Sequence, residues 1–397
     1  MTEWIERKIA DLGMVVGGAT PSTKDAQNYI NGSIPWITPK DLAGFHGRYI
    51  GQGERNITEK GLASCSTQMM PKNSVLFTSR APIGYIAISA NPVCTNQGFK
   101  SIVPNENTDY LFLYYLLKFN KDRIESLGSG TTFKEVSGTT MKNIVVTVPK
   151  EKETQREIAA ILSSLDDKIE ENGKINHNLQ QQVLAMYQKI FVDSPNDDRR
   201  ICRADECFDI SIGKTPPRKE AEWFKTVQAD NIVWVSIADM GNCGLFIADS
   251  SEYLSPAAVK KFNVAIVPDN TVLLSFKLTV GRIAITDGWM TTNEAIAHFK
   301  TENKFINEYL YCYLKSYNFQ TLGSTSSIAT AVNSKIIKAM PFVVPTDDEL
   351  AIFHNFAAPI FEKIKAYQHE NVQLTRLRDS LLPKLMSGEI DVSDVVI

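Results

Sequence analysis

The stretch VLFTSRAPIGYIAI at residues 75–88 returns at residues 272–285 in the altered form VLLSFKLTVGRIAI. Six positions are identical, and the basic residue Arg80 is matched by the basic residue Lys277. The two stretches lie 197 residues apart in a chain of 397 residues. A strand pair that recurs after half the chain length predicts two copies of one module.

The similarity continues along the chain, because five further stretches recur in the same order at offsets of 195 to 198 residues. They are GATP (18–21) and GKTP (213–216), IPWITPKDL (34–42) and IVWVSIADM (232–240), TNQGF (95–99) and TNEAI (292–296), SLGSGTTF (126–133) and TLGSTSSI (321–328), and MKNIVVTVP (141–149) and IKAMPFVVP (337–345). Apolar runs that resemble each other by chance do not keep a common order and spacing. The sequence therefore indicates an internal duplication.

Each copy divides into a globular part and a helical part. Short β-branched runs bounded by Gly, Pro, Asn and Ser are typical of strands, and residues 109–127 are typical of an amphipathic helix. We expect an α+β fold with two pseudo-symmetric globular domains, head 1 and head 2, separated by a pair of long antiparallel coiled-coil helices. The expected bounds are 1–149 for head 1, 150–193 for the first helix, 194–345 for head 2, 346–388 for the second helix and 389–397 for a C-terminal tail.

The helical part of the first copy carries an apolar stripe with heptad spacing. Its apolar positions lie 4, 3 and 4 residues apart over 158–169, and again over 179–190. Asn172 and Asn176 occupy the seam between these runs, and Asn371 follows Asn176 by 195 residues in the second helix. We expect the two stripes to bury each other, with the three asparagines fixing the register of the pair.

Two further expectations concern the helices. Pro359 is expected to kink or restart the second helix, and Pro383 is expected to end its regular part. An alternative to the helix pair is two amphipathic helices that each pack on their own head. The stripe is narrow and long, which favours the helix pair over this alternative.

The composition predicts a cytoplasmic protein without a membrane span or a metal site. No apolar run approaches the roughly 18 residues of a membrane span, and the first residues lack the layout of a signal peptide. The six cysteines form no CxxC pair and no Cys/His cluster, which is typical of reduced thiols. The formal net charge of −3 hides an uneven distribution, because residues 1–150 are basic and both helical segments are acidic.

A search for catalytic motifs gives no candidate. GKT at 213–215 resembles the end of a phosphate-binding loop, but Phe208 stands where the leading glycine is required. ANPVC at 90–94 lacks the second proline and the aromatic residue of an amino-methyltransferase motif. We therefore predict no catalytic residue, no metal ligand and no cofactor bound by this chain, and the sequence favours a binding protein.

Two related but unequal heads suit a target with two related but unequal parts. DNA is the natural candidate, because its helical repeat makes the distance between half-sites a matter of geometry. A homodimer with identical heads reads a palindrome, whereas a duplicated single chain can read an asymmetric, bipartite site.

These features together resemble the specificity subunit of a type I restriction–modification system. The resemblance covers nearly the whole chain, with GxTP near the start of each head, the Trp-containing strand, APIG, TNQG and LGSG. Its most specific parts are VPKEKETQREIAAILSSLDDKIEEN (148–172), which opens the first helix, and LRDSLLPKLMSGEI (377–390), which closes the second.

The resemblance implies a set of partners. In that family the heads are target recognition domains for double-stranded DNA, and the coiled coil sets the spacing of the two half-sites. Two methyltransferase subunits bind the specificity subunit, and two motor-nuclease restriction subunits join them for cleavage. The resemblance also implies that S-adenosylmethionine binds the partner methyltransferase subunits, while the specificity subunit itself carries no catalytic residue.

Candidate DNA contacts follow from the chemistry of each head. Basic side chains contact phosphates, and polar side chains in loops read base edges. The candidates are Lys24, Lys40, Arg80, Thr131, Thr132 and Lys134 in head 1, and Lys214, Arg218, Lys219, Lys277, Ser324 and Thr325 in head 2. The Thr-Asn pairs at 95–96 and 292–293 are shared by both heads, which favours a role in the fold over base reading.

Two alternatives remain open at the level of the sequence. An adaptor that brackets proteins with its two heads, without DNA specificity, would have the same repeat and coiled coil. It predicts no salt-dependent DNA affinity even with partner subunits present. A self-contained DNA-modifying enzyme is the second alternative, and it predicts binding of a methyl donor by this chain alone.

Overall fold

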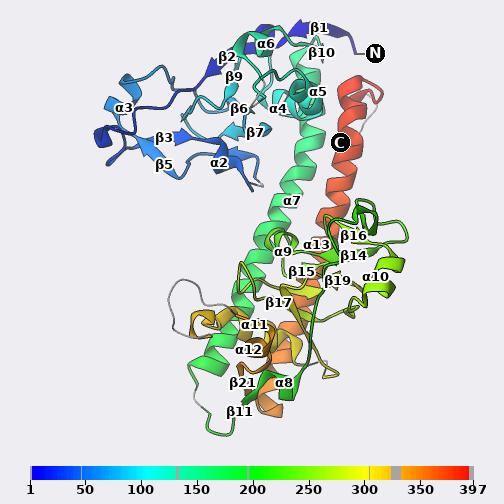
Figure 1. The fold of residues 1–397 in the computed structure, drawn as a ribbon. Helices are drawn as coiled ribbons and strands as arrows, with labels where there is room; N and C mark the ends of the chain where they lie inside the picture. Colours follow the sequence, from blue (N-terminus) through cyan, green and yellow to red (C-terminus); the bar gives the residue numbers. More distant parts are fainter. Residues whose placement is uncertain are drawn as a thin grey trace. The chain divides into compact units, whose positions relative to one another are not determined.

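The computed structural model describes residues 2–45, 47–130, 134–194, 196–303, 305–322 and 332–392. The chain forms two compact units, Met1–Glu170 with Val372–Ile397, and Glu171–Asn371. Each unit holds one head, the first part of the long helix that follows this head, and the last part of the other long helix (Figure 1).

Head 1 contains two sheets and a two-stranded ribbon. Its strands are β1 (Trp4–Lys8), β2 (Gly13–Gly17), β3 (Ile34–Ile37), β4 (Tyr49–Ile50), β5 (Arg55–Ile57), β6 (Val75–Ser79), β7 (Ile83–Ser89), β8 (Cys94–Thr95), β9 (Lys100–Pro104) and β10 (Val145–Pro149). The sheets have the orders β2–β9–β6–β7–β4 and β5–β3–β8, and β1 pairs with β10. The pairs β4–β7 and β3–β8 are parallel and the others antiparallel. Stretch 75–88 thus forms the β6–β7 hairpin, with Val75 opposite Ile88.

The helices of head 1 are α1 (Ile9–Leu12), α2 (Pro39–Leu42), α3 (Glu59–Ala63), α4 (Tyr110–Phe119), α5 (Lys121–Ser126) and α6 (Gly138–Asn143). Asp109 caps the N-terminus of α4, and its carboxylate accepts hydrogen bonds from the amides of Leu111 and Phe112 at 2.9 and 3.0 Å. Residues 112–117 of α4 are all buried, as expected for a helix that is apolar around its whole circumference. They form one core with β6 on one side and with Ile158 and Leu162 of the long helix on the other.

Head 2 repeats this architecture. Its strands are β11 (Arg200–Arg203), β12 (Asp209–Ile212), β13 (Phe224–Lys225), β14 (Ile232–Val235), β15 (Phe246–Ile247), β16 (Tyr253–Leu254), β17 (Val272–Ser275), β18 (Ile283–Thr286), β19 (Thr291–Thr292), β20 (Ile296–Lys300) and β21 (Pro341–Val344). The sheet orders are β12–β20–β17–β18–β15 and β13–β16–β14–β19, and β11 pairs with β21. The helices are α8 (Ala204–Cys207), α9 (Ile237–Asn242), α10 (Pro256–Phe262), α11 (Asn307–Ser316) and α12 (Ser334–Lys338).

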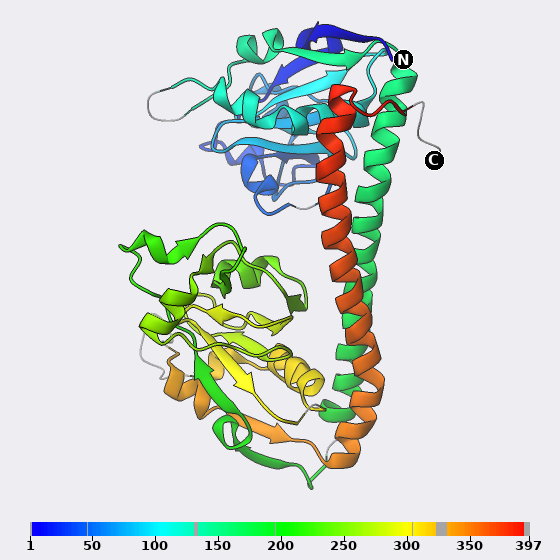
Figure 2. The same ribbon diagram turned by 90° about the vertical axis from the view of Figure 1, so that its right-hand side faces the viewer.

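The two long helices are α7 (Lys152–Tyr187), which ends in a π-helical turn at Gln188–Val192, and α13 (Asp347–Ser387). In the second unit Asn172 donates to Asn371 Oδ1 at 2.9 Å and Asn176 donates to the carbonyl of Ile364 at 3.4 Å. Rising residue numbers in α7 therefore meet falling numbers in α13, so the helices run antiparallel (Figure 2). In the first unit Asp166 of α7 pairs with Arg378 of α13 at 2.5 Å and accepts a hydrogen bond from Tyr115 at 2.6 Å.

The long helices pack on the heads as well as on each other. Both arrangements considered for the apolar stripe, the helix pair and the packing of a helix on a head, therefore occur together. Ile158 and Leu162 join the core of head 1, and this core also holds Leu385 of α13. Val183 of α7 joins the core of head 2, where it shares a cluster with Phe353 of α13. The same apolar stripe thus serves the helix pair and the heads.

Two expectations for the prolines in α13, a restart at Pro359 and an end of the helix at Pro383, are corrected, because the helix runs through both residues. Pro359 marks no restart, and Pro383 does not end the helix, which continues to Ser387. Both prolines are exposed. Leu385 and Met386, just after Pro383, are 1% and 2% exposed in the core of the first unit. Burial of the opposite helix face therefore outweighs the backbone hydrogen bond that a proline removes.

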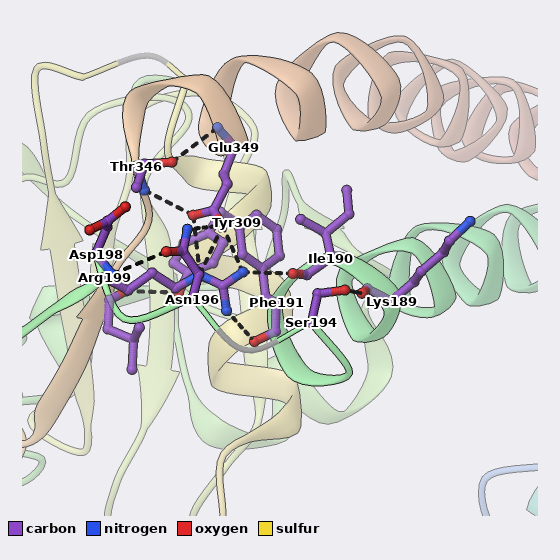
Figure 3. A network of polar contacts seen from close by, with 11 residues as sticks. Lys189, Ile190, Phe191, Ser194, Asn196, Asp198, Arg199, Tyr309, Thr346 and Glu349 are labelled. Atoms are coloured by element: carbon purple, nitrogen blue, oxygen red, sulfur yellow. Dashed lines mark hydrogen bonds and ion pairs between the residues drawn. The ribbon is translucent and has the colours of Figure 1, made fainter.

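A polar network in the second unit joins the end of α7 to the start of α13 (Figure 3). The guanidinium of Arg199 donates to the carbonyls of Ile190 and Phe191 at 2.7 and 2.8 Å, and to both carboxylate oxygens of Glu349. Glu349 also accepts from the amide of Thr346 at 3.0 Å. The bonds from Arg199 lower the pKa of Glu349 to about 2. One half-buried arginine thus satisfies the last carbonyls of one helix and the first-turn carboxylate of the other.

The heads contact their helices through different chemistry. Arg48, 5% exposed, forms ion pairs with Asp167 and with Glu170, the latter at 3.0 Å. The position 195 residues after Glu170 is Lys365, whose ammonium lies 5.4 Å from the ring centroid of Phe246 and 2.9 Å from Asp287. Phe246 is the counterpart of Tyr49, because Phe246 lies opposite Ile285 as Tyr49 lies opposite Ile88, and the counterpart of Arg48 is Leu245. The helix position of Glu170 therefore carries the opposite charge in the second unit, whereas the position of Asp167 keeps a carboxylate as Glu362.

Among the helices of the described residues, none combines the length and the apolar character needed to cross a membrane.

The buried histidine of head 2 makes stability depend on pH. His298 is fully buried, with Nδ1 3.0 Å from the Ser211 hydroxyl and Nε2 2.7 Å from the Thr292 hydroxyl. Burial lowers its pKa to about 3. An unfolded chain binds a proton at this residue below about pH 6.5 while the folded chain does not. The stability that the neutral ring contributes is therefore fully present above pH 6.5 and falls as the pH drops from 6.5 towards 3.

We predict that the free energy of unfolding of head 2 falls by about 2 kcal/mol more between pH 7 and pH 5 in the unmodified chain than in a His298→Gln variant. Urea denaturation at the two pH values measures this difference. His177→Gln, at an exposed position of α7, is the matched control. Parallel pH dependence in the unmodified chain and His298→Gln would contradict the prediction.

Candidate nucleic-acid interface

Each head carries the same arrangement of three segments, which we call the loop frame. It consists of the GxTP loop (18–21 or 213–216), a tryptophan (Trp36 or Trp234) and the TN turn (95–99 or 292–296). The indole of Trp36 donates to the carbonyl of Ala19 at 3.1 Å, and that of Trp234 donates to the carbonyl of Lys214 at 3.1 Å. The loop frame is therefore present in both copies of the internal repeat.

Close backbone approach explains the glycine of each GxTP loop. The amide of Ala19 donates to the carbonyl of Thr95 at 3.0 Å, and that of Lys214 donates to the carbonyl of Thr292 at 2.9 Å. A Cβ on Gly18 would lie 2.1 Å from the carbonyl oxygen of Asn96, and a Cβ on Gly213 would lie 2.2 Å from that of Asn293. Only glycine allows the loop to cross the TN turn at this distance.

In head 1 the sequence-predicted basic residues differ in what they contact. Lys24 and Lys134 are exposed, and within the described ranges no ion pair holds either of them. Lys40 is exposed and pairs with Glu54 at 2.6 Å. Arg80 directly follows β6 and pairs with Glu135 at 3.5 Å, and Glu135 also holds Lys100 at 3.3 Å. Arg80 and Lys134 therefore lie near each other, beside the loop that contains Glu135.

In head 2 two of the basic candidates are held by other protein groups, and two lysines without an ion pair among the described residues, which we call unengaged, are not. Arg218 forms a two-pronged ion pair with Glu252 at 2.7 and 2.9 Å and lies over the rings of Phe224 and Trp234. Lys214 donates to the carbonyl of Phe262 at 2.6 Å. Lys219 and Lys277 are exposed, and neither has an ion pair in the part of the chain that the structure describes.

The polar candidates and the asparagines complete the predicted set. Thr131, Thr132, Ser324 and Thr325 lie outside the described residues. Asn172 is fully buried and donates to Asn371 and to Glu370, at 2.9 and 2.8 Å. Asn172 and Asn176 each retain a buried side-chain oxygen without a hydrogen-bond partner among the described residues. Their role in fixing the register stays a prediction.

Sequence reasoning missed one exposed position in the TN turn. Gln97 in head 1 is replaced by Glu294 in head 2, and each accepts a hydrogen bond from the threonine of its GxTP loop, Thr20 or Thr215. The signal was present, because this is a position where TNQGF and TNEAI differ in polar chemistry.

The second unit contains a hollow of about 450 Å³ where head 2 contacts the long helices. Cys243 and Lys315 line it together with polar side chains of α7 and α13. Burial lowers the pKa of Lys315 and raises that of Cys243 to about 11. The thiol is therefore protonated at neutral pH and is no nucleophile. In the described ranges, no group of three or more His, Cys, Asp or Glu residues is arranged to hold a metal ion.

Comparison with known sequences identifies one family over both copies. The pattern described as "Type I restriction modification DNA specificity domain" matches residues 1–181 and 196–375. The type I restriction enzyme MjaIX specificity subunit of Methanocaldococcus jannaschii is 33% identical, over 99% of this chain and 95% of that protein. The HindI specificity subunit of Haemophilus influenzae is 25% identical over 76% of this chain and 79% of its own length.

A solved structure supports the same fold. The S subunit of a type I restriction–modification system from M. genitalium matches with a TM-score of 0.56 and 16% sequence identity. The match covers 97% of this chain and 96% of that one. The α+β architecture with two duplicated heads and long helices is therefore confirmed.

We predict that Gly18→Ala destabilises head 1 by about 3 kcal/mol, because its new Cβ meets a fixed backbone carbonyl. The neighbouring Gly17→Ala is the matched control, since a Cβ there meets only the Lys100 side chain at 4.0 Å. Gly17→Ala is expected to change stability by less than about 1 kcal/mol. Urea denaturation measures both, and equal losses in the two variants would refute the close approach.

Proposed function

This chain belongs to the family of type I restriction–modification DNA specificity proteins, and from that premise we propose that each head reads one half of a bipartite DNA site. Both halves of the chain match the family separately, which is the observation that carries the proposal. The loop frame occurs in each head with the same hydrogen bonds, so two equivalent surfaces are available for two half-sites. The helix pair then sets the spacing between the half-sites.

The unengaged lysines are the best candidates for phosphate contacts. Lys24 and Lys134 in head 1, and Lys219 and Lys277 in head 2, are exposed and have no carboxylate to displace in the part that the structure describes. Arg218 is already held by Glu252 and two aromatic rings, so its charge serves the fold of head 2. Phosphate contacts of this kind position a head, and base contacts then give specificity.

The chain acts as a non-catalytic subunit of a larger assembly. We propose that two methyltransferase subunits, which bind S-adenosylmethionine, dock on it, and that two motor-nuclease subunits join for cleavage. The acidic long helices suit protein partners better than phosphate, because like charges repel DNA. Since the target is DNA and the thiols are free, we place the assembly in the cytoplasm.

We predict that co-expression with its methyltransferase subunit produces adenine methylation at one bipartite motif, with two defined halves around a fixed gap. Sequencing the methylated bases of the host genome measures it. Replacing residues 1–149 by the first head of another family member should change one half of the motif and leave the other half intact. A stable complex that gives no new methylation would favour the protein-bracketing adaptor instead.

We predict that Lys277→Ala weakens DNA binding by the assembled complex equally for target and unrelated duplexes. The slope of log affinity against log salt concentration should fall by about 1, because one phosphate contact is lost. Fluorescence anisotropy between 50 and 200 mM salt would measure it. Lys335→Ala, at an exposed position on α12, is the matched control. A loss confined to the target duplex would argue against a phosphate role.

A further inference from the structure

Each unit contains a hollow beside the buried helix of its head, α4 or α11. The hollow of the first unit has a volume of about 310 Å³ and that of the second unit about 450 Å³. A glycine, a tyrosine and a lysine line both hollows, and each of the three recurs after 197 positions. They are Gly47, Tyr114 and Lys118 in the first unit, and Gly244, Tyr311 and Lys315 in the second. The duplication has therefore retained one polar setting in both units.

The lysine of each hollow belongs to the last turn of its helix and lies over a tyrosine one turn earlier. The Lys118 ammonium is 5.2 Å from the ring centroid of Tyr114, and the Lys315 ammonium is 5.7 Å from that of Tyr311. Both tyrosines are buried, so their rings are fixed in the core of the unit. The attraction between ring and cation helps to hold each ammonium at the hollow.

The positive charge of each hollow is not balanced within its unit. Among the described residues, no ion pair holds Lys118 or Lys315, and no aspartate or glutamate lines either hollow. Lys121 adds a second positive charge to the hollow of the first unit. Burial lowers the pKa of Lys118 and of Lys315, because the protein solvates each ammonium less well than water does. A carboxylate beside each ammonium would offset this loss.

The form and the repetition of the hollows favour a protein side chain as the ligand. A phosphate of duplex DNA is attached to a wide, rigid helix and suits lysines that project from a surface, whereas a carboxylate on a side chain can enter a recess. The two half-sites of the proposed DNA target differ, but the two methyltransferase subunits are copies of one chain. A setting that both units share therefore suits the partner that is the same for both.

We propose that each hollow is a socket for an aspartate or glutamate side chain of one methyltransferase subunit. Lys118 is the ion-pair partner of this carboxylate in the first unit, and Lys315 is its partner in the second. The same acidic residue of the methyltransferase enters both sockets, because both subunits have one sequence. This inference rests on the proposed function, and it adds where each methyltransferase subunit is held and through which chemistry.

The test uses substitutions that remove the charge and keep most of the side chain, Lys118→Gln and Lys315→Gln, in the full chain. Calorimetric titration with the methyltransferase subunit measures the two binding steps. Each single variant is expected to weaken one step roughly 10- to 100-fold, because one charge-assisted hydrogen bond is lost. The double variant should weaken both steps. Lys118→Arg and Lys315→Arg retain the charge and should bind more tightly than the glutamine variants.

A second measurement on the unmodified complex does not depend on the folding of any variant. A carbodiimide joins an amine to a carboxylate that is in direct contact with it. Mass spectrometry of the digested complex is expected to show Lys118 and Lys315 each joined to the same acidic peptide of the methyltransferase. Cross-links from the two lysines to different peptides would contradict a shared socket.

The matched controls are Lys142→Gln on α6 and Lys335→Gln on α12, because both lysines are exposed and neither lines a hollow. They should leave both binding steps unchanged. Absence of methyltransferase binding to the unmodified chain would count against the proposed function itself. Retention of both binding steps in the double variant would overturn the inference and leave the proposed function standing. This holds also if that variant loses affinity for DNA or for inorganic phosphate instead.

Discussion

Each unit depends on one buried helix that is packed between a sheet and the long helices. In head 1 this is α4, whose residues 112–117 contact β6 on one side and Ile158 and Leu162 of α7 on the other. In head 2, α11 has the equivalent place, with Tyr309 and Leu310 in one core with Val183. Because interiors are close-packed, the sheet and the loop frame it supports keep a fixed position on their helix segments within the unit.

The sequence was sufficient for the parts of the fold that repeat or have a period. The matched stretches predicted two heads, and the heptad spacing with Asn172 predicted antiparallel helices. The spacing did not reveal that Ile158 and Val183 also belong to the cores of the heads, because a period reports which face is apolar and not what covers it. The rule for proline failed at Pro383 for a related reason, since tertiary burial of Leu385 and Met386 stabilises the helix beyond it.

The candidate site shows the same division. The basic residues were found from the sequence, but the ion pairs that hold some of them were not. Glu252, the partner of Arg218, lies 34 residues away in the sequence. The network of Arg199 and Glu349 joins residues 150 positions apart, so no local sequence pattern predicts it. Gln97 and Glu294 already differ between the two copies in the sequence, and the structure adds that both contact the threonine of their GxTP loop, Thr20 or Thr215.

The charge difference at one helix position beneath the two heads restricts which position in the chain each head fits. Arg48 has two carboxylates, Asp167 and Glu170, beneath it, whereas the helix position that corresponds to Glu170 in the second unit is Lys365. A copy of the first head placed at the second position would exchange the carboxylate of Glu170 for the like charge of Lys365 beside Arg48. The ion pairs of Arg48 therefore match the first head to the helix surface of the first unit.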